Sequence, residues 1–411
     1  MKNGAMTLFA TGLGGIPSFI AQAAKAGKII TPYKKNKILI CIFQRGAMDG
    51  LMAVNPYSFD ELKKARPSLF MSPSNKEGSL FDLDGSFGLH PSLLKFNNLF
   101  TENRMAIVHG VGSPNNTRSH FDAQDFMESG TPFNKGTESG WLNRAIGLTG
   151  HEGSPFRAVS STSSLPRSFY GKNETLSISD LQSFSLKATG KNNSSNVSKS
   201  FESLYDSNNE SLLNKTSKDS FEALKILNQK NISSYKAKDG INYPNSPLGN
   251  ALKQLAVLIK MDIGLEVGFA ESGGWDTHYN QGTTNGTMAR NLSDFSDSIA
   301  AFWSDIEIYQ DQVTLMSMTE FGRTVHQNGT GGTDHGRASC MFVLGNDILG
   351  GKVYNKIAGF SKELLEDERD LPVTTDFRSV FSTVATNHLS LIENNILFPE
   401  WDGPKLNLIR S

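Results

Sequence analysis

The stretch KILICIF (Lys37–Phe43) is apolar at every position after its lysine, and the turn-forming segment QRGAMDG follows it directly. An uninterrupted apolar run of this length is typical of a strand buried on both faces of a parallel sheet. Helical patterns separate the later runs, most clearly at Leu248–Met261 and Met288–Ile306. Strands that alternate with helices predict a three-layer α/β/α fold with a mostly parallel central sheet. The later runs are Met105–Val111, Leu265–Ala270, Val313–Met318 and Cys340–Leu344.

Composition narrows the class of protein. The 411 residues include 40 Lys and Arg against 41 Asp and Glu, a net charge of −1. Bulk electrostatics therefore favours neither nucleic acid nor an anionic membrane surface as a partner. Cys41 and Cys340 both lie in apolar runs, which indicates two buried free thiols in preference to a disulfide.

The chain divides into a leader and connector, 1–36, and a domain, 37–411, that contains a polar insertion, 162–247. Met6–Ala24 is an apolar run that ends near Ala-Gln-Ala, so it predicts a secretory signal with a cleavage site close by. The run is too short and interrupted to predict a transmembrane helix, and an N-terminal helix or a disordered lead is the alternative. The insertion is rich in Ser, Asn and Lys, and we expect it to border the site or to be partly disordered.

Five polar clusters lie beside the apolar runs, four of them directly after a run. In open α/β sheets ligands bind at the carboxyl ends of the strands, so these clusters should converge. The first cluster is QRGAMDG, in which Asp49 stands on a glycine-flanked turn. Its carboxylate could approach a metal ion because the backbone there is unobstructed, or it could instead close an Asx-turn.

The second cluster, SPNNTRSHFDAQD, follows Met105–Val111. A helix that begins here would offer free backbone N–H groups and a positive dipole end to an oxyanion or to an alkoxide nucleophile. Ser119 and Thr117 are the candidate nucleophiles, and Arg118 could pair with a phosphate or sulfate oxygen. His120 could serve as an additional metal ligand or as a proton donor. The alternative is that Thr117 or Ser119 only caps the helix.

The third and fifth clusters combine carboxylates with imidazoles. GGWDTH places Asp276 and His278 two residues apart, where both can reach one divalent ion; a structural Asp–His hydrogen bond is the alternative. GGTDHG precedes the last apolar run and offers His335 as a third ligand. Asp334 would be a further ligand or the outer partner that fixes the tautomer of His335. A plain glycine-rich turn is the alternative here.

The fourth cluster, EFGR, follows Val313–Met318 and supplies Glu320 and Arg323, for which a surface ion pair is the alternative reading. Together the clusters offer mixed oxygen and nitrogen donors that suit Zn, Mn, Mg or Ca. The predicted metal ligands are Asp49, Asp276, His278, Glu320 and His335.

Several of these segments also resemble a known family. The motifs are FQRGAMDGLMAVNPY, HGVGSPNNTRSHFDAQD, GWLNR, GGWDTH, TEFGRT and GTDHGRASCMFVLG, in that order. The chain resembles the domain-of-unknown-function 1501 (DUF1501) family from Lys37 to near its C-terminus, apart from the polar insertion. That family is grouped with the alkaline phosphatase and sulfatase superfamily. The resemblance implies an alkaline phosphatase-like α/β/α fold and a metal-centred site.

The superfamily order is a strand-end Asp, a nucleophile at a helix start, an Asp/His pair, a strand-end acidic pair and a late His. Glu320 falls where Asp-His-Gly is expected, but this sequence reads Glu-Phe-Gly. A second ion would lose a histidine ligand there, so the resemblance implies one well-made divalent site and a second possible one. The matching residues are Asp49, Ser119 or Thr117, Asp276, His278 and His335.

The leading hypothesis is an exported, metal-dependent hydrolase of phosphate or sulfate esters. The metal would lower the pKa of the nucleophilic hydroxyl, while Arg118, Arg45 or Arg323 would hold the small anionic substrate, with His120 beside it. A non-catalytic exported binding protein that keeps the fold is the alternative, and a phosphomutase or other transferase is a third reading. The leader resembles a twin-arginine export signal without its arginine pair. We therefore expect a periplasmic or cell-envelope protein whose true start lies upstream.

Overall fold

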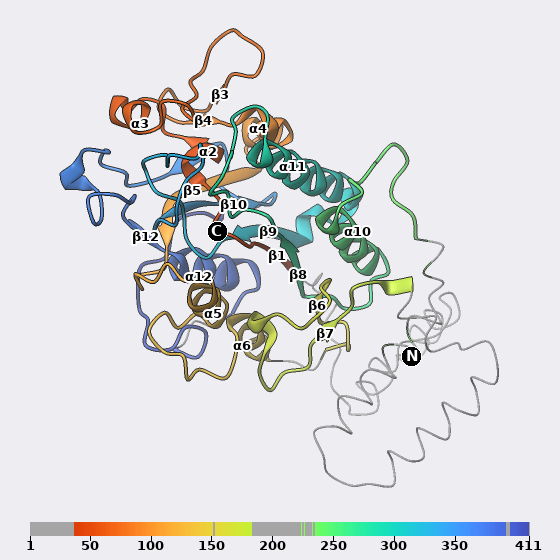
Figure 1. Ribbon diagram of the computed structural model, residues 1–411. Coiled ribbons are helices and arrows are strands. Elements are labelled where there is room, and N and C mark those ends of the chain that lie inside the picture. The colour runs from red at the N-terminus through yellow and green to blue at the C-terminus, as the bar shows by residue number, and fades with distance from the viewer. Residues whose placement is uncertain are drawn as a thin grey trace, which may run out of the picture.

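A computed structural model describes residues 37–150, 153–182, 223, 226, 232, 235–391 and 395–410. The predicted leader, 1–36, and much of the predicted insertion lie outside the described residues. Within the described part, a nine-stranded sheet has the order β11-β5-β10-β9-β1-β8-β6-β7, with β12 paired to β5 (Figure 1). Its strands are β1 (Ile38–Gln44), β5 (Met105–Gly112), β6 (Ala158–Ser160), β7 (Leu176–Ser177), β8 (Val267–Ser272), β9 (Val313–Met318), β10 (Ser339–Leu344), β11 (Lys352–Tyr354) and β12 (Thr375–Asp376).

Most strand pairs of this sheet are parallel, which confirms the predicted fold class. β1, predicted to be buried on both faces of a parallel sheet, pairs in parallel with both β8 and β9. β10 is the exception, because it runs antiparallel to both β5 and β9. As a result, the N-terminal end of β10 lies at the same edge of the sheet as the C-terminal ends of its neighbours.

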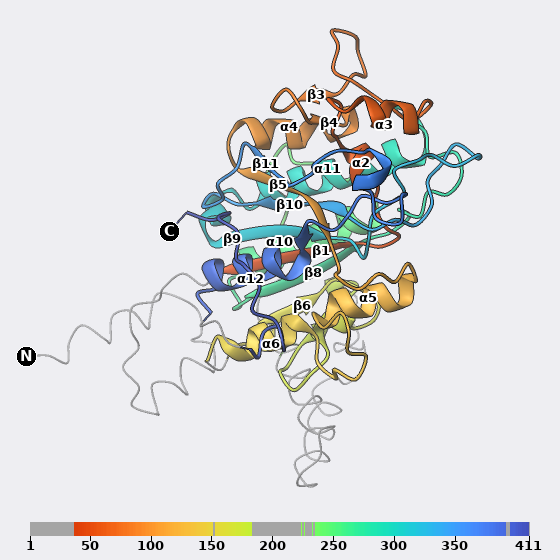
Figure 2. The same cartoon turned by 90° about the vertical axis from the view of Figure 1, so that its left-hand side faces the viewer.

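Helices cover both faces of the sheet, as Figure 2 shows from the side. On one face, α4 (Leu94–Thr101), α10 (Pro247–Lys260) and α11 (Thr287–Asp305) pack against the even-numbered residues of β1, such as Ile40. On the other, α5 (His120–Ser129), α6 (Trp141–Leu148) and α12 (Phe377–His388) pack against odd-numbered residues such as Cys41. Alternate side chains of a strand point to opposite faces, so an apolar strand serves two cores.

Shorter elements complete the described chain. A small antiparallel sheet, β2-β4-β3, lies outside the main sheet. Its strands are β2 (Val54–Asn55), β3 (Phe81–Asp82) and β4 (Gly88–Leu89), and the short helices nearby are α2 (Gly50–Ala53) and α3 (Asp60–Ala65). Short 3₁₀ helices occupy Pro91–Leu93, Arg167–Phe169, Glu307–Gln312 and Lys362–Leu364.

Local chemistry sets where two of the long helices begin. Ser246 accepts a hydrogen bond from the amide of Gly249 at 3.0 Å at the start of α10, and Asp376 caps α12 through the amide of Arg378. None of the described helices is long and apolar enough to cross a membrane. Cys41 and Cys340 are buried free thiols, as predicted.

Three buried histidines predict an acid-sensitive fold. Burial lowers the pKa of His90, His109 and His388 from 6.5 to about 4. Between pH 6.5 and pH 4 the unfolded chain binds more protons than the folded chain. The contribution of these histidines to the free energy of unfolding is therefore fully present above pH 6.5 and is lost as the pH drops towards 4. We expect the free energy of unfolding to fall by up to about 1.4 kcal/mol per pH unit for each histidine.

Urea unfolding between pH 7 and pH 4, at constant ionic strength, measures this slope. The variant His388→Gln should show a shallower slope than the wild type, because its buried position no longer titrates. A slope that stays unchanged in this variant would contradict the assignment.

Candidate metal centre

The carboxyl edge of the sheet brings together four predicted segments that are distant in sequence. β8 ends at Ser272 just before Asp276, and β9 ends at Met318 just before Glu320. His335 precedes β10 but reaches the same edge because β10 runs antiparallel to its neighbours. His120 is the first residue of α5, which follows β5. The alternation of strands and helices therefore brings these side chains together at the carboxyl edge of the sheet.

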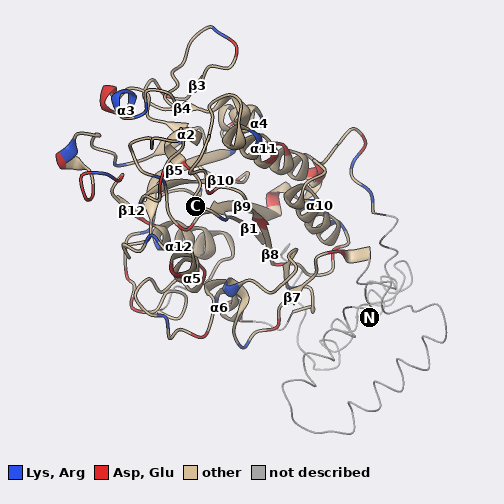
Figure 3. Cartoon of the chain, viewed as in Figure 1, with Lys and Arg blue, Asp and Glu red and all other residues tan. Residues whose placement is uncertain are grey.

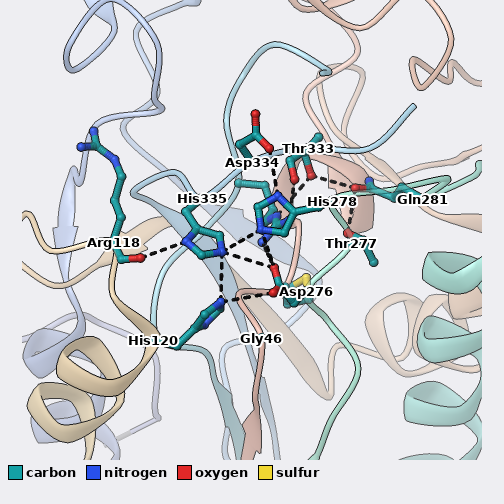
Figure 4. A network of polar contacts seen from close by, with 12 residues as sticks. Gly46, Arg118, His120, Asp276, Thr277, His278, Gln281, Thr333, Asp334 and His335 are labelled. Carbon is teal, nitrogen blue, oxygen red and sulfur yellow. Dashed lines mark hydrogen bonds and ion pairs between the residues drawn. The ribbon is translucent and has the colours of Figure 1, made fainter. Parts of the chain in front are cut away.

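Three imidazoles and one carboxylate meet there (Figure 4). The Nε2 atom of His335 lies 3.0 Å from Nε2 of His120 and 2.9 Å from Nε2 of His278. Oδ1 of Asp276 lies 3.0 Å from Nε2 of His278 and 3.3 Å from Nε2 of His335. Its other oxygen lies 3.5 Å from Nε2 of His120. We call these four residues the metal cluster.

The opposite nitrogen of each imidazole has a hydrogen-bond acceptor. Nδ1 of His120 donates to Glu320 at 2.8 Å, and Nδ1 of His278 donates to Asp334 at 2.9 Å. Nδ1 of His335 donates to the carbonyl oxygen of Arg118 at 2.9 Å. An ionised carboxylate or a carbonyl can only accept, so Nδ1 carries the proton in each neutral ring and the Nε2 lone pair faces the cluster.

The donor set fits a divalent ion. Two nitrogen lone pairs at 2.9 Å repel each other unless a proton or a metal cation lies between them. A tetrahedral zinc site with Zn–N bonds of about 2.0–2.1 Å has ligand atoms about 3.3 Å apart, close to the separations of His335 from its three neighbours. Donor atoms of His120, Asp276 and His335 all lie within 4.8 Å of one another. A nitrogen-rich set favours zinc or a similar transition ion over magnesium or calcium.

Neighbouring charges tune the cluster before any ion binds. The hydrogen bond that His120 donates to Glu320 raises the pKa of His120, whereas burial lowers the pKa of His335. Burial alone would raise the pKa of Asp276, but the hydrogen bond and charge of Arg323 hold it below its usual value. The carboxylate of Asp276 is therefore ionised, as a metal ligand must be. Side chains of the cluster are between 25% and 44% exposed, so an ion and a small ligand can reach them.

Glycines allow the loops to stack closely behind the ligands. Gly46 has a φ of +117°, and an added Cβ there would lie 2.6 Å from the backbone nitrogen of Asp276. Its own amide donates to Glu320 at 2.8 Å. At Gly332 an added Cβ would lie 2.4 Å from the carbonyl carbon of His278. Side chains at these two positions would displace the ligand loops.

A buried polar network continues from the cluster into the core. Arg323 donates to Asp276 at 2.7 Å and, through Nε, to the hydroxyl of Thr333 at 3.2 Å. Thr333 and Thr277 each donate to the side-chain oxygen of Gln281 at 2.8 Å. The amide nitrogen of Gln281 donates to Asp49 at 2.7 Å. The contacts therefore link Asp49 to the ligand Asp276 through buried side chains.

The structure places Asp49 at the far end of this network and does not bring it to the other predicted ligands. Both of its oxygens pair with the buried guanidinium of Arg66, at 2.8 and 3.1 Å. Removing one partner of a buried pair of this kind typically costs about 3–5 kcal/mol. Asp49 thus fills a structural position, and neither Arg66 nor Gln281 carried a sequence signal that predicted it.

Two further predicted ligands hold the outer nitrogens of the imidazoles. Glu320 is fully buried and accepts from His120, Gln124 and the amide of Gly46. Asp334 contacts His278 and not its neighbour His335. His120, predicted as an additional metal ligand, a proton donor or a substrate contact, lies in the metal cluster.

The candidate nucleophiles border the cluster. Ser119 is exposed at the N-cap of α5, next to His120, and its hydroxyl makes no capping hydrogen bond. Thr117 instead uses its hydroxyl to accept from the amide of Ser119 at 3.2 Å. Ser119 is therefore the better placed of the two candidates.

The arginines predicted to hold an anion are all paired with carboxylates. Arg45 donates to Glu128 and Glu271 at 2.9 and 2.7 Å. Arg118 pairs with Asp370 and Asp367, and Figure 4 shows its guanidinium directed away from the histidines. Arg323 is buried against Asp276, as described above. The three guanidinium groups thus stabilise the framework of the site.

Comparison with known proteins places the chain in a family. The family model for proteins of unknown function, DUF1501, matches residues 105–395 and confirms the resemblance seen in the motifs. No curated protein matches the chain.

Two solved structures are similar at a low level. A protein of the alkaline phosphatase superfamily from Vibrio parahaemolyticus is 10% identical with a TM-score of 0.36; the match covers 80% of this chain and 64% of that one, less than two thirds of its length. An alkaline phosphatase from the Antarctic bacterium TAB5 is 13% identical with a TM-score of 0.33, covering 78% of this chain and 95% of that one. Similarity at this level gives no information about the chemistry of the site.

The network behind Asp276 predicts an effect of Thr333 on metal affinity. In Thr333→Val, Nε of Arg323 loses its hydroxyl acceptor, and only the backbone carbonyl of Thr333 still positions the guanidinium, so Arg323 holds Asp276 less firmly. We expect zinc affinity, measured by competition with a chelating dye, to fall roughly tenfold. Thr277→Val is the matched control, because it removes another buried hydroxyl bonded to Gln281 but none bonded to Arg323. Equal losses in the two variants would contradict the predicted route.

Proposed function

We propose that this chain, which belongs to the DUF1501 family, is a metal-dependent hydrolase of phosphate or sulfate esters. One observation carries the proposal: the imidazoles of His120, His278 and His335 all turn their Nε2 atoms towards Asp276. Four protein ligands would fill a tetrahedral site, so an ester that reaches the ion at this exposed sheet edge, next to Ser119, would enter as a fifth ligand. That setting suits chemistry on a bound ester.

The residues of the chain divide the work as follows. His120, Asp276, His278 and His335 would hold the ion, while Glu320 and Asp334 keep two of the rings in the correct tautomer. A divalent ion held there would stabilise developing charge on an ester oxygen and lower the pKa of a nearby hydroxyl. Ser119, at the start of α5, would be the nucleophile, where the helix dipole favours an alkoxide.

A second candidate function is a non-catalytic protein that binds a ligand at the same edge. The pairing of Arg45 and Arg118 with carboxylates favours it, because neither cation is free to orient a transferring group. A conserved fold does not guarantee chemistry. The two candidates differ in turnover and not in metal content.

Export of the protein to the periplasm or cell envelope is part of the same proposal. Its support is the apolar run Met6–Ala24, which ends in small residues, as secretory signals do. The mass of the mature protein recovered from the envelope fraction tests it: cleavage near Ala23 supports export, and an intact leader in the cell interior contradicts it.

Metal content tests the cluster itself. We expect one equivalent of a divalent transition ion in the purified wild type, and its loss in His335→Ala and Asp276→Ala, because each variant removes one ligand. His326→Ala is the matched control, since that histidine is exposed and lies outside the cluster. Elemental analysis of the dialysed proteins gives the result. A wild-type protein that is purified without metal and binds no zinc when zinc is added would contradict the proposal.

Turnover tests the nucleophile. Ser119→Ala should retain the metal but lose more than about 1000-fold in kcat on an ester that the wild type hydrolyses. Thr117→Val should lose far less, because its hydroxyl is bonded to the backbone of Ser119. A panel of phosphate and sulfate esters measured by product release provides the comparison. Full activity in Ser119→Ala would remove the serine from the mechanism, and an inactive wild type that contains metal would favour the binding protein.

A further inference from the structure

We propose that the site selects monoanionic esters that carry an aromatic or apolar group, over dianionic phosphate monoesters. Sulfate monoesters and phosphate diesters share this chemistry. The inference rests on the proposed hydrolase function and narrows its substrate class. It follows from the balance of charge around the metal cluster and from two exposed aromatic side chains at its border.

The charges in contact with the cluster cancel. Asp276 is a ligand, and Glu320 and Asp334 contact the outer nitrogens of two ligands. The three negative charges of these carboxylates equal the two positive charges of a divalent ion plus the single positive charge of Arg323. The ion and the charged groups around it thus have no net charge. A second negative charge on a bound ester would be repelled by the carboxylates with no additional cation to offset it.

The described cations near the cluster add no net positive charge. Figure 3 shows acidic and basic residues interspersed along the elements. At the site, each arginine is paired with at least one carboxylate, and a dianion would have to displace these pairs. The pairs are Arg45 with Glu128 and Glu271, Arg118 with Asp367 and Asp370, Arg337 with Glu366, and Arg369 with Asp370.

Aromatic side chains follow two of the ligands directly in the chain. Phe121, next to His120, is 88% exposed, and Tyr279, next to His278, is 69% exposed. Consecutive Cα atoms are only about 3.8 Å apart, so the backbone of both residues lies at the border of the cluster, and a bound ester is within range of an exposed ring that turns towards it. Exposed rings of this size are costly to hydrate and gain from a flat apolar partner. The border therefore suits the organic group of an ester better than a second charge.

A matched pair of ligands tests the charge preference without turnover. Benzenesulfonate and phenylphosphonate share the ring and the three-oxygen head, but the first is a monoanion and the second a dianion in alkaline buffer. Calorimetric titration of the zinc-loaded protein should give benzenesulfonate the lower Kd. A Kd for phenylphosphonate that is equal or lower would overturn the proposal, and so would the absence of binding by both.

A charge variant tests the cause. Glu271→Gln removes one carboxylate partner of Arg45 at a part-exposed position. It should shift selectivity towards phenylphosphonate by roughly two- to fivefold. Glu102→Gln is the matched control, because it removes a carboxylate partner of Arg104 near the start of β5, at the opposite end of the strand from the site. An equal shift in the two variants, or none in Glu271→Gln, would overturn the charge argument.

A ring variant tests the apolar contact. Phe121→Ala should weaken benzenesulfonate binding roughly threefold or more, while leaving the Kd of methanesulfonate unchanged. Phe133→Ala is the matched control, a similarly exposed phenylalanine, 72% accessible, beyond the C-terminal end of α5. Loss of binding in the control as well, or none in Phe121→Ala, would overturn the assignment of the ring.

Failure of this inference and failure of the proposed function give different results. Hydrolysis of an aryl phosphate monoester in preference to the matching aryl sulfate and diester leaves a metal-dependent hydrolase but overturns the charge preference. Binding of benzenesulfonate with no hydrolysis of any ester supports the charge preference of the site while overturning the hydrolase.

Discussion

The close approach of histidine Nε2 atoms, at about 3 Å, organises the edge of the sheet, and the proposed metal ion would lie between them. The Nε2 atom of His335 faces two such nitrogens and the carboxylate of Asp276. The arrangement depends on acceptors behind the rings, of which Glu320 and Asp334 are carboxylates. The contacts of the surrounding loops, from the glycine turns to the buried network behind Asp276, serve to keep these nitrogens aimed inward.

Much of the fold could be predicted because buried strands leave a strong pattern. The run Lys37–Phe43 covers all of β1 except its last residue, and the ends of the predicted run Leu265–Ala270 lie within two residues of those of β8. The direction of β10 could not be predicted, since an apolar run is the same read from either end. That direction brings His335, which precedes its strand, to the same edge as ligands that follow theirs.

The site was predictable only in part, for a related reason. Sequence position indicates which side chains reach the edge of the sheet, but not which partner each one meets there. Asp49 was expected to bind metal, yet Arg66 and Gln281 take up its oxygens, and a contact between residues so far apart leaves no local signal. Arg118 shows the same limit, because its partners lie about 250 positions later. Pairing of this kind turns predicted substrate contacts into parts of the framework.

The most direct test of this account is the X-ray absorption spectrum of the zinc-loaded wild-type protein. We predict a first shell of three imidazole nitrogens and one oxygen at about 2.0–2.1 Å, with the outer-ring scattering of three histidines. His120→Ala should reduce that scattering to two rings, because it removes one of the nitrogens that face His335. An oxygen-only shell, or a spectrum unchanged in His120→Ala, would contradict the metal centre on which the rest of the account depends.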